Sequence, residues 1–372
     1  MDIIGIICEY NPFHNGHIYH INKIKEMYPD SIIIAVISSS FCQRGEISIL
    51  NKWDKTKIAL DNNIDLVVEL PFVYSTQSAD IFAKGSLKIL NELKVDKLIF
   101  GSESNDINNL KEIASVQLNN KDFDKKVKQY LDEGINYPTA VSCALKDLNI
   151  KINNTPNDLL GISYIKEIIK NKYNIEPITI KRTNDYHAKD IKGNILNASL
   201  IRELINSNKR ITKYIPKKEE RYIYKNIDYF KLLKYKILSD KENLSTYQTV
   251  DEGIENRILK YINEVNDINE LVEKIKNKRY TYNKVNRMLI HILASLTKEE
   301  AKLDIDYIRV LGMNDKGKKY LGKTSTKLPI ITSYKNSNSK LLDIEKRVNE
   351  IYSIIINDKS LIKRELEKPV IK

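Results

Sequence analysis

Three of the five histidines in this 372-residue chain lie close together, at His14, His17 and His20. A neutral imidazole donates a hydrogen bond to a phosphate oxygen without placing a fixed cation beside it. Gly16 has no side chain, so the backbone between the first two histidines can approach a phosphate closely. Donors that are already in place lower the barrier when charge develops on an α-phosphate attacked in line. We therefore predict that His14 and His17 are catalytic residues of a nucleotide-phosphate site.

The elements around this cluster are those of an anion site. Ile3–Cys8 is a short apolar run typical of a buried strand, and a helical pattern extends from about residue 17 to residue 28. The N-terminus of a helix that follows a strand attracts anions, because its free amide N–H groups and its dipole both face outward. The histidines are therefore expected at the first strand-to-helix turn.

Zinc binding is the competing interpretation of the histidine cluster. No nearby cysteine, aspartate or second histidine pair completes a set of four zinc ligands. Cys8, Cys42 and Cys143 are odd in number, widely spaced and without a CxxC pattern, which indicates neither a zinc knuckle nor a disulfide framework. We therefore expect no metal bound by protein side chains. His20 is either a packing residue on the helix face or a further residue of the nucleotide loop.

Apolar runs alternate with helical patterns over the first hundred residues. The runs are Ile3–Cys8, Ile32–Ile37, Ile64–Leu70 and Lys97–Phe100, and the helical patterns cover residues 17–28, 52–62 and 79–93. Strands that are apolar on both faces and separated by helices indicate a parallel sheet covered on both sides. We predict a Rossmann-like, doubly wound α/β domain whose ligands lie beyond the carboxyl ends of its strands.

Helical patterns then dominate, with few strands. Residues 106–170 are helical in pattern, Pro177–Ile180 is typical of a returning strand, and Asn197 is suited to cap a further helix. Beyond residue 208 the pattern stays mostly helical to about residue 300. A strand-like segment at Tyr307–Gly312 and a helix near Leu341–Ile356 complete the chain.

The net positive charge of the chain comes entirely from its second segment. Residues 1–208 contain 25 Lys and Arg against 26 Asp and Glu, and residues 209–372 contain 36 against 23. Basic residues interleave with tyrosines at 209–236, 274–287 and 316–319. A neutral segment followed by a basic one is typical of a catalytic domain (1–208) joined to a mostly helical polyanion-binding domain (209–372). The alternative is an ordinary solvated, Lys-rich surface.

The N-terminal sequence favours the cytoplasm. Met1–Ile4 is acidic where a secretory signal would be basic, and a strand pattern follows at once. No apolar run approaches the roughly 18 residues that a membrane-spanning helix needs.

Specific motifs resemble one known family. The segment Glu9–His17 contains an HxGH motif of the nucleotidyltransferase type and resembles the signature of the bacterial tRNA(Met) cytidine acetate ligase family. Further matching segments follow in order: Phe41–Glu46, Asn51–Trp53, Asp65–Pro71, Ala79–Ala83, Phe100–Glu103, Pro156–Gly161, Asp185–His187, Arg279–Thr281 and Ile308–Met313. The resemblance covers nearly the whole chain.

The resemblance implies a two-step reaction on elongator tRNA(Met). Acetate and ATP, with Mg²⁺ bound to the nucleotide, give acetyl-adenylate and pyrophosphate, and N4 of the wobble cytidine then takes the acetyl group and releases AMP. The resemblance places ATP against Ile7, Cys8, Glu9, Tyr10, Asn11, Pro12, Phe13, His14, Asn15, Gly16, His17, Ile18, Tyr19 and His20.

It also implies three ATP-binding residues further along the chain, Gly101, Asn157 and Arg182. Gly101 would leave room for adenine or ribose, Asn157 would offer an amide, and Arg182 suits a phosphate clamp. The alternatives are a helix-start residue for Asn157 and a surface residue for Arg182.

Two further motifs match the wider superfamily less well. The usual ISSTxxR phosphate segment is replaced by Asn197–Arg202, which keeps one serine and the arginine, so Arg202 stays a candidate phosphate contact while a role for Ser199 is weakened. Lys323–Lys327 mimics a synthetase KMSKS loop but lies deep in the second segment, so we expect it to have no such role.

Two other functions are compatible with the motifs. A small-molecule adenylyltransferase would use the same HxGH chemistry, although such enzymes are usually short and lack a basic helical domain of this size. An RNA-binding protein that keeps a nucleotide only as a regulator is the other alternative, and the intact His14 and His17 argue against it.

Overall fold

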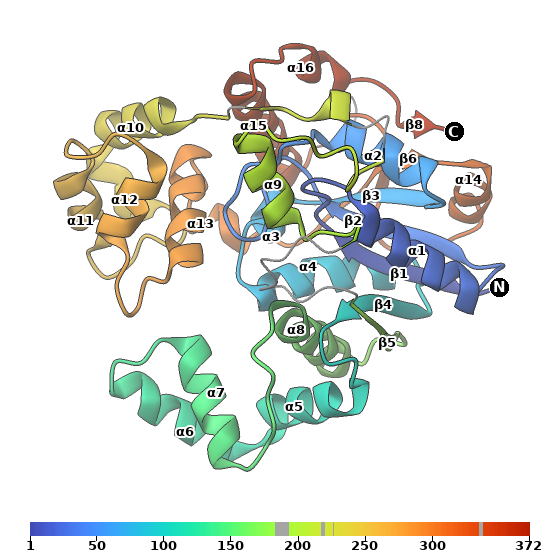
Figure 1. Ribbon diagram of the computed structural model, residues 1–372, viewed down its shortest axis with the longest axis horizontal. Coiled ribbons are helices and arrows are strands. Elements are labelled where there is room, and N and C mark those ends of the chain that lie inside the picture. Colours follow the sequence, from blue (N-terminus) through green and yellow to red (C-terminus); the bar gives the residue numbers. More distant parts are fainter. Residues whose placement is uncertain (183–192, 217–219, 226, 335–337) are drawn as a thin grey trace.

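A parallel β-sheet organises the N-terminal part of the chain. The computed structural model describes residues 1–182, 193–216, 220–225, 227–334 and 338–372 (Figure 1). The strands are β1 (Ile3–Cys8), β2 (Ile32–Ser38), β3 (Leu66–Leu70), β4 (Lys97–Ser102) and β5 (Glu176–Lys181). They are parallel and lie in the order β5-β4-β1-β2-β3. This order confirms the predicted Rossmann-like arrangement.

Helices cover both faces of the central strands. Every residue of β2 and β3 is buried, so both faces of the sheet are covered at its centre. The first helices are α1 (Asn15–Met27), α2 (Lys52–Asp61), α3 (Phe72–Ser75), α4 (Ala79–Glu92), α5 (Ile107–Asn119), α8 (Pro156–Asn171) and α9 (Ala198–Asn206). Helix α2 packs against β3, α4 against β2 and β3, and α8 against β4. The predicted cap at Asn197 is confirmed, because its side chain accepts a hydrogen bond from Leu200 N.

Four helices after residue 208 form a cluster of their own. They are α10 (Phe230–Ser239), α11 (Ile254–Tyr261), α12 (Ile268–Ile275) and α13 (Tyr282–Leu293), accompanied by short 3₁₀ turns at Glu220–Tyr222, Lys241–Thr246 and Glu300–Lys302. Figure 1 shows this helical cluster projecting on the same side of the sheet as the pair α6 (Lys121–Asp132) and α7 (Tyr137–Asp147). No helix in these described ranges is both long and apolar enough to cross a bilayer.

The C-terminal segment returns to the sheet. Strand β6 (Ile308–Met313) pairs antiparallel with β3, and the short strands β7 (Ile330–Ile331) and β8 (Val370–Ile371) pair with β6. Helices α14 (Asp315–Leu321), α15 (Lys340–Ile355) and α16 (Ser360–Arg364) accompany them. The sheet therefore takes strands from both sides of residue 208. The predicted domains 1–208 and 209–372 stay a prediction. The structure adds that the segment after residue 208 contributes strands to the sheet of the first segment.

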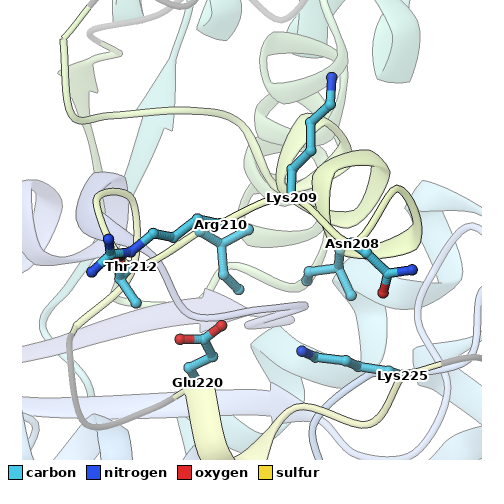
Figure 2. A pocket seen from close by; sticks show the side chains of 8 residues that line it. Asn208, Lys209, Arg210, Thr212, Glu220 and Lys225 are labelled. Atoms are coloured by element: carbon cyan, nitrogen blue, oxygen red, sulfur yellow. Dashed lines mark hydrogen bonds between the residues drawn. The ribbon is translucent and has the colours of Figure 1, made fainter.

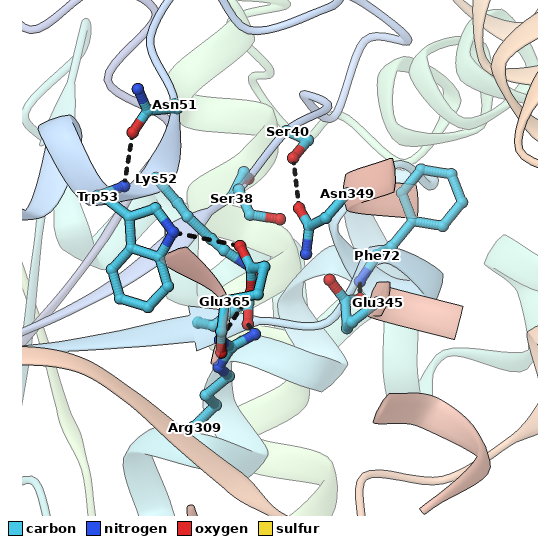
Figure 3. A network of polar contacts seen from close by, with 12 residues as sticks. Ser38, Ser40, Asn51, Lys52, Trp53, Phe72, Arg309, Glu345, Asn349 and Glu365 are labelled. Carbon is cyan, nitrogen blue, oxygen red and sulfur yellow. Dashed lines mark hydrogen bonds and ion pairs between the residues drawn. The ribbon is translucent and has the colours of Figure 1, made fainter. Parts of the chain in front are cut away.

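Buried ion pairs join the two parts of the sheet (Figure 3). The Lys52 ammonium lies 2.8 Å from Glu69 and 3.0 Å from Glu365, and the Arg309 guanidinium lies 3.2 Å and 2.7 Å from the same carboxylates. Trp53 Nε1 donates to Glu365 at 3.2 Å. Two cations thus balance two carboxylates, which is the condition for keeping charges in a low-dielectric interior. The network links α2, β3, β6 and the segment after α16.

Candidate active site

His14 and His17 cap helix α1 reciprocally. His14 Nδ1 accepts a hydrogen bond from Gly16 N at 3.0 Å, and His17 Nδ1 accepts one from His14 N at 3.1 Å. Because both Nδ1 atoms accept, each neutral ring carries its proton on Nε2. The ring centroids are 3.8 Å apart. The motif spacing therefore presents two neighbouring Nε2–H donors at the N-terminus of a helix.

The protein holds these rings neutral. Burial, followed by the charges of Arg182 and Arg202, lowers the pKa of His14 to about 3. Burial also lowers the pKa of His17 well below its ordinary value, with His14 and Arg182 adding to the effect. The pKa of His20 falls to about 4 for the same reason, and its Nε2 has no hydrogen-bond partner among the described residues. The rings are therefore uncharged and available as hydrogen-bond donors.

Packing fixes the orientation of the imidazoles. The rings of Tyr10 and Phe13, both buried, lie 4.8 Å and 5.3 Å from the His17 ring. A Cβ atom at Gly16 would lie 2.8 Å from His14 Cε1, so only glycine leaves the His14 ring where it is. The glycine predicted for its closeness to a phosphate is therefore also needed for the position of the His14 ring.

Polar contacts anchor the whole loop. Asn15 N donates to Tyr214 O at 2.9 Å, and Asn15 Nδ2 donates to Asn194 O and Lys213 O at 2.7 Å and 3.0 Å. Asn11 precedes a cis peptide bond to Pro12, and its Oδ1 accepts from Ile49 N at 2.9 Å. The remaining predicted loop residues lie at the end of β1 or in the first turns of α1: Ile7, Cys8, Glu9, Ile18, Tyr19 and His20.

The other three predicted ATP-binding residues lie together, and Glu103 connects two of them. Asn157 Nδ2 donates to Glu103 at 2.5 Å, and Arg182 Nε lies 3.6 Å from the same carboxylate. A Cβ atom at Gly101 would lie 3.2 Å from Arg182 Cγ, so the arginine stem packs on this glycine. Sequence reasoning assigned no role to Glu103. Its only signal was its place in the matching segment Phe100–Glu103.

The two groups of residues lie at the carboxyl edge of the sheet. Strand β4 lies beside β1 and β5 lies beside β4, so Gly101, near the end of β4, and Arg182, directly after β5, lie at the same edge as the histidine loop. Arg182 N also donates to Ser102 O at 3.0 Å. The effect of Arg182 on the pKa of all three loop histidines shows that its charge lies near them. The site thus combines neutral donors with a nearby guanidinium.

The Arg202 guanidinium already has hydrogen-bond and ion-pair partners within the protein. Its Nη1 donates to Asn11 O at 2.7 Å, and its Nη2 pairs with Glu46 at 2.7 Å and lies 3.4 Å from Ser199 Oγ. Arg202 therefore supports the histidine loop from α9. A direct contact between Arg202 and a phosphate stays a prediction.

A loop that sequence reasoning did not assign covers part of the site. Phe41 and Ile47 pair as an isolated bridge and close this loop, which we call the covering loop (Phe41–Ile47). Gln43 N donates to Glu9 at 2.6 Å, and burial raises the pKa of Glu9 above its ordinary value. The match at Phe41–Glu46 was the available signal, but it did not show where the loop packs.

Two other sequence features lie away from this site or outside the described residues. Lys327 N donates to Glu92 at 2.9 Å and Tyr320 OH donates to Leu93 O, so Lys323–Lys327 lies near the amino end of β4, opposite the site. Asp185–His187 falls outside the described residues. Within the described ranges, no cluster of three histidine, cysteine or acidic side chains could hold a metal.

A hollow of about 340 Å³ lies beside Lys213 and Tyr214, whose carbonyl groups accept hydrogen bonds from Asn15 (Figure 2). Figure 2 shows Glu220 and Lys225 on one side of it and Arg210, whose Nε donates to Thr212 Oγ1 at 3.0 Å, on the other. Its lining is Ile205, Asn208, Lys209, Arg210, Ile211, Thr212, Glu220 and Lys225. None of the predicted nucleotide-site residues lines this hollow.

Comparison with known proteins agrees with this geometry. A family model described as HIGH nucleotidyl transferase matches residues 1–367. A tRNA(Met) cytidine acetate ligase of Caldicellulosiruptor saccharolyticus is 40% identical over 376 residues, which cover 95% of this chain and 94% of that protein. The chain belongs to the tRNA(Met) cytidine acetate ligase family. A member from Fusobacterium nucleatum is 38% identical, with 95% of this chain and 96% of that protein covered. The resemblance predicted from the motifs is confirmed.

Two solved structures of Thermotoga maritima TmcAL match over the full length of the chain. Thermotoga maritima TmcAL bound with alpha-thio ATP superposes with a TM-score of 0.89 at 27% identity, and the match covers 100% of this chain and 99% of that one. The apo form of the same protein matches with a TM-score of 0.89 at 28% identity. The shared architecture therefore includes the sheet and the segment after residue 208.

Proposed function

We propose that this protein is an ATP-dependent acetate ligase that acetylates N4 of the wobble cytidine of elongator tRNA(Met). An acetate oxygen attacks the α-phosphorus of ATP, the bond to pyrophosphate breaks, and acetyl-adenylate forms. The cytidine amine then attacks the acetyl carbonyl carbon, AMP leaves, and the nitrogen loses a proton to give N4-acetylcytidine. The observation that carries this proposal is the pair of neutral, reciprocally fixed imidazoles at the start of α1.

The geometry suits the first step because no side-chain nucleophile is required. Acetate itself attacks, so the protein needs to position two anions and stabilise the charge that develops on phosphate. The Nε2–H groups of His14 and His17 would donate to the phosphate oxygens, and the loop Ile7–His20 would enclose the triphosphate. Gly101, Asn157 and Arg182 would hold the nucleoside end and a phosphate. Mg²⁺ would arrive with ATP as part of the substrate, bound through phosphate oxygens.

Family membership supports the choice of substrates. The related proteins are named for tRNA(Met) and acetate, and the Thermotoga maritima relative holds alpha-thio ATP. The excess of Lys and Arg after residue 208 suits the phosphates of a tRNA. A tRNA substrate would place the reaction in the cytoplasm.

Acetate-dependent pyrophosphate exchange tests the first step. We expect the wild-type protein to exchange labelled pyrophosphate into ATP when acetate is present, without RNA. Exchange that required a phosphorylated cofactor precursor would instead indicate a small-molecule adenylyltransferase. Mass analysis of elongator tRNA(Met) after incubation with protein, ATP and acetate tests the second step. Unmodified tRNA would favour an RNA-binding protein that is regulated by nucleotide.

His17→Ala separates catalysis from RNA binding. The substitution removes one phosphate donor and the acceptor for His14 N. We expect exchange to fall by about 10²–10³-fold, the usual cost of a preorganised donor, while tRNA affinity in a filter-binding assay stays near that of wild type. Lost tRNA binding with normal adenylate yield would contradict the role of His17.

A further inference from the structure

Arg287, on helix α13, has no polar or ring partner among the described residues. It is half-buried, and no residue in the described ranges forms a hydrogen bond, ion pair or ring contact with it. The other arginines in those ranges have polar or ring partners. Burial lowers the pKa of Arg287 to about 10. A partly desolvated cation is costly when it is unpaired, so an anion from outside the chain would stabilise it.

Arg287 lies where the helical cluster meets the covering loop. A Cβ atom at Gly45 would lie 2.3 Å from Arg287 N and 2.4 Å from Asn286 C, so the loop rests directly on the backbone of α13. Further along the same helix, His291 Nε2 lies 2.7 Å from Thr76 O in the segment between α3 and α4. Helix α13 is therefore held against the catalytic part of the chain at two places.

The covering loop connects Arg287 to the nucleotide site. On its other side the loop donates from Gln43 N to Glu9, which follows β1 directly. Arg44 is close enough to Arg182 to oppose its charge. The covering loop thus lies between Arg287 and the histidine loop. An anion bound at Arg287 would therefore lie near the nucleotide site without taking part in the adenylation step.

Tyrosine rings lie near the start of α13, the helix that carries Arg287. Tyr282, at the start of α13, is 45% exposed. Burial raises the pKa of Tyr229, and Tyr282 and Glu46 raise it further, so Tyr229 lies near both the start of α13 and the covering loop. Lys284 Nζ lies 3.9 Å from the centroid of the Tyr280 ring. Cations and aromatic rings therefore occur together at the start of α13.

On the basis of the proposed function, we infer that Arg287 binds a backbone phosphate of the tRNA next to the acceptor cytidine, with Tyr282 as ring surface for an unpaired base. The guanidinium is a planar fork of donors that matches two phosphate oxygens. Unpaired RNA bases stack on exposed aromatic rings, and single-stranded segments combine such rings with nearby cations. Acetate is the other external anion of the reaction, but it must reach the α-phosphate on the histidine side of the covering loop.

The test compares Arg287→Ala with Arg257→Ala in the full-length protein. Arg257 is exposed on α11 of the same helical cluster, and its Nε donates to Lys274 O. The control therefore removes the same charge from the same cluster. Filter binding over a range of salt concentrations measures the affinity for elongator tRNA(Met), and acetate-dependent pyrophosphate exchange without RNA measures adenylation.

We expect Arg287→Ala to weaken tRNA binding by about ten- to a hundredfold, the range for a lost charged hydrogen bond. The slope of log affinity against log salt should fall by about 1, as for one lost phosphate contact. Arg287→Lys, which keeps the charge and loses the fork, should lie between wild type and Arg287→Ala. Arg257→Ala should bind less than about threefold more weakly than wild type. Pyrophosphate exchange should stay at the wild-type rate in all three variants.

Unchanged tRNA affinity and salt slope in Arg287→Ala would overturn the inference. A raised KM for acetate or ATP with normal RNA binding would also overturn it, because Arg287 would then serve the nucleotide site. If Arg287→Ala lowers the Tm, Arg287→Gln provides the second variant, and the salt slope still separates a phosphate contact from a structural role. If the wild-type protein binds tRNA through Arg287 but transfers no acetyl group, the phosphate site stands and the proposed reaction fails.

Discussion

At the scale of single residues, His14 and His17 depend on each other. Each Nδ1 accepts a backbone N–H at the start of α1, which leaves Nε2–H as the donor for a ligand. The residue types predicted phosphate donors, but the sequence alone did not show the tautomer. The tautomer depends on which ring nitrogen the folded backbone uses, and that information exists only in three dimensions.

Gly16→Ala tests this arrangement without removing a functional group. The new Cβ would lie 2.8 Å from the His14 ring, so the ring must move from its cap position. We expect pyrophosphate exchange to fall by about tenfold or more, in keeping with the cost of a misplaced donor. The fold should persist because alanine is favourable within a helix. Gly322→Ala is the control, since its Cβ would meet only ordinary contact at 3.5 Å. Wild-type exchange in Gly16→Ala would contradict the account of the cap.

The role of Glu103 could not be predicted from the sequence. The resemblance indicated Gly101, Asn157 and Arg182, and the structure brings them together. The carboxylate that holds two of them was not assigned a role, because Asn157 lies 54 positions further along the chain. An acidic side chain in a loop has no readable role until its partners are known.

At the scale of elements, the parallel strands were predictable and the antiparallel one was only partly so. Continuous apolar runs such as Ile32–Ile37 specify strands buried on both faces. The pattern at Tyr307–Gly312 also predicted a strand. Its partner β3 lies about 240 positions earlier, as the Glu69–Arg309 pair shows, and no local pattern specifies a pairing at that distance.

A substitution at Gly45 tests whether the covering loop packs against α13. Gly45 has a φ of 78° and Gly134 a φ of 82°, so alanine at either position is strained by about 1 kcal/mol or more. Only at Gly45 would the new Cβ also collide with α13, at 2.3 Å from Arg287 N, whereas nothing lies within 4 Å at Gly134. We expect Gly45→Ala to lower the Tm more than Gly134→Ala and to reduce acetyl transfer to tRNA. Equal effects of the two variants would show that the loop does not dock as described.

At the scale of the whole molecule, buried charges hold the C-terminal segment on the sheet. Lys52 and Arg309 are balanced by Glu69 and Glu365. Glu345, on α15, is a further buried carboxyl nearby and accepts a hydrogen bond from Phe72 N. Burial, followed by the Glu69 charge, raises the pKa of Glu345 to about 8. At neutral pH the neutral form of Glu345 keeps the network balanced.

Glu345→Gln should therefore change how stability depends on pH. In the unfolded chain this carboxyl ionises near its ordinary pKa of 4.5, and in the folded chain near 8. Between these values the folded state binds more protons, so wild-type stability falls as pH rises through this window. We expect the advantage of Glu345→Gln, measured by denaturant unfolding, to grow from pH 5 to pH 8 and to reach about 1 kcal/mol or more. A stability difference that did not vary with pH would contradict the neutral state of Glu345.

The central claim is that a triphosphate binds at the turn between β1 and α1 through two neutral imidazoles. A crystal structure with a non-hydrolysable ATP analogue and Mg²⁺ tests it most directly. We predict phosphate oxygens within hydrogen-bond distance of Nε2 of both His14 and His17, with Arg182 on the opposite side of the nucleotide. Nucleotide bound elsewhere, or a metal ion coordinated by the two Nε2 atoms, would contradict the account.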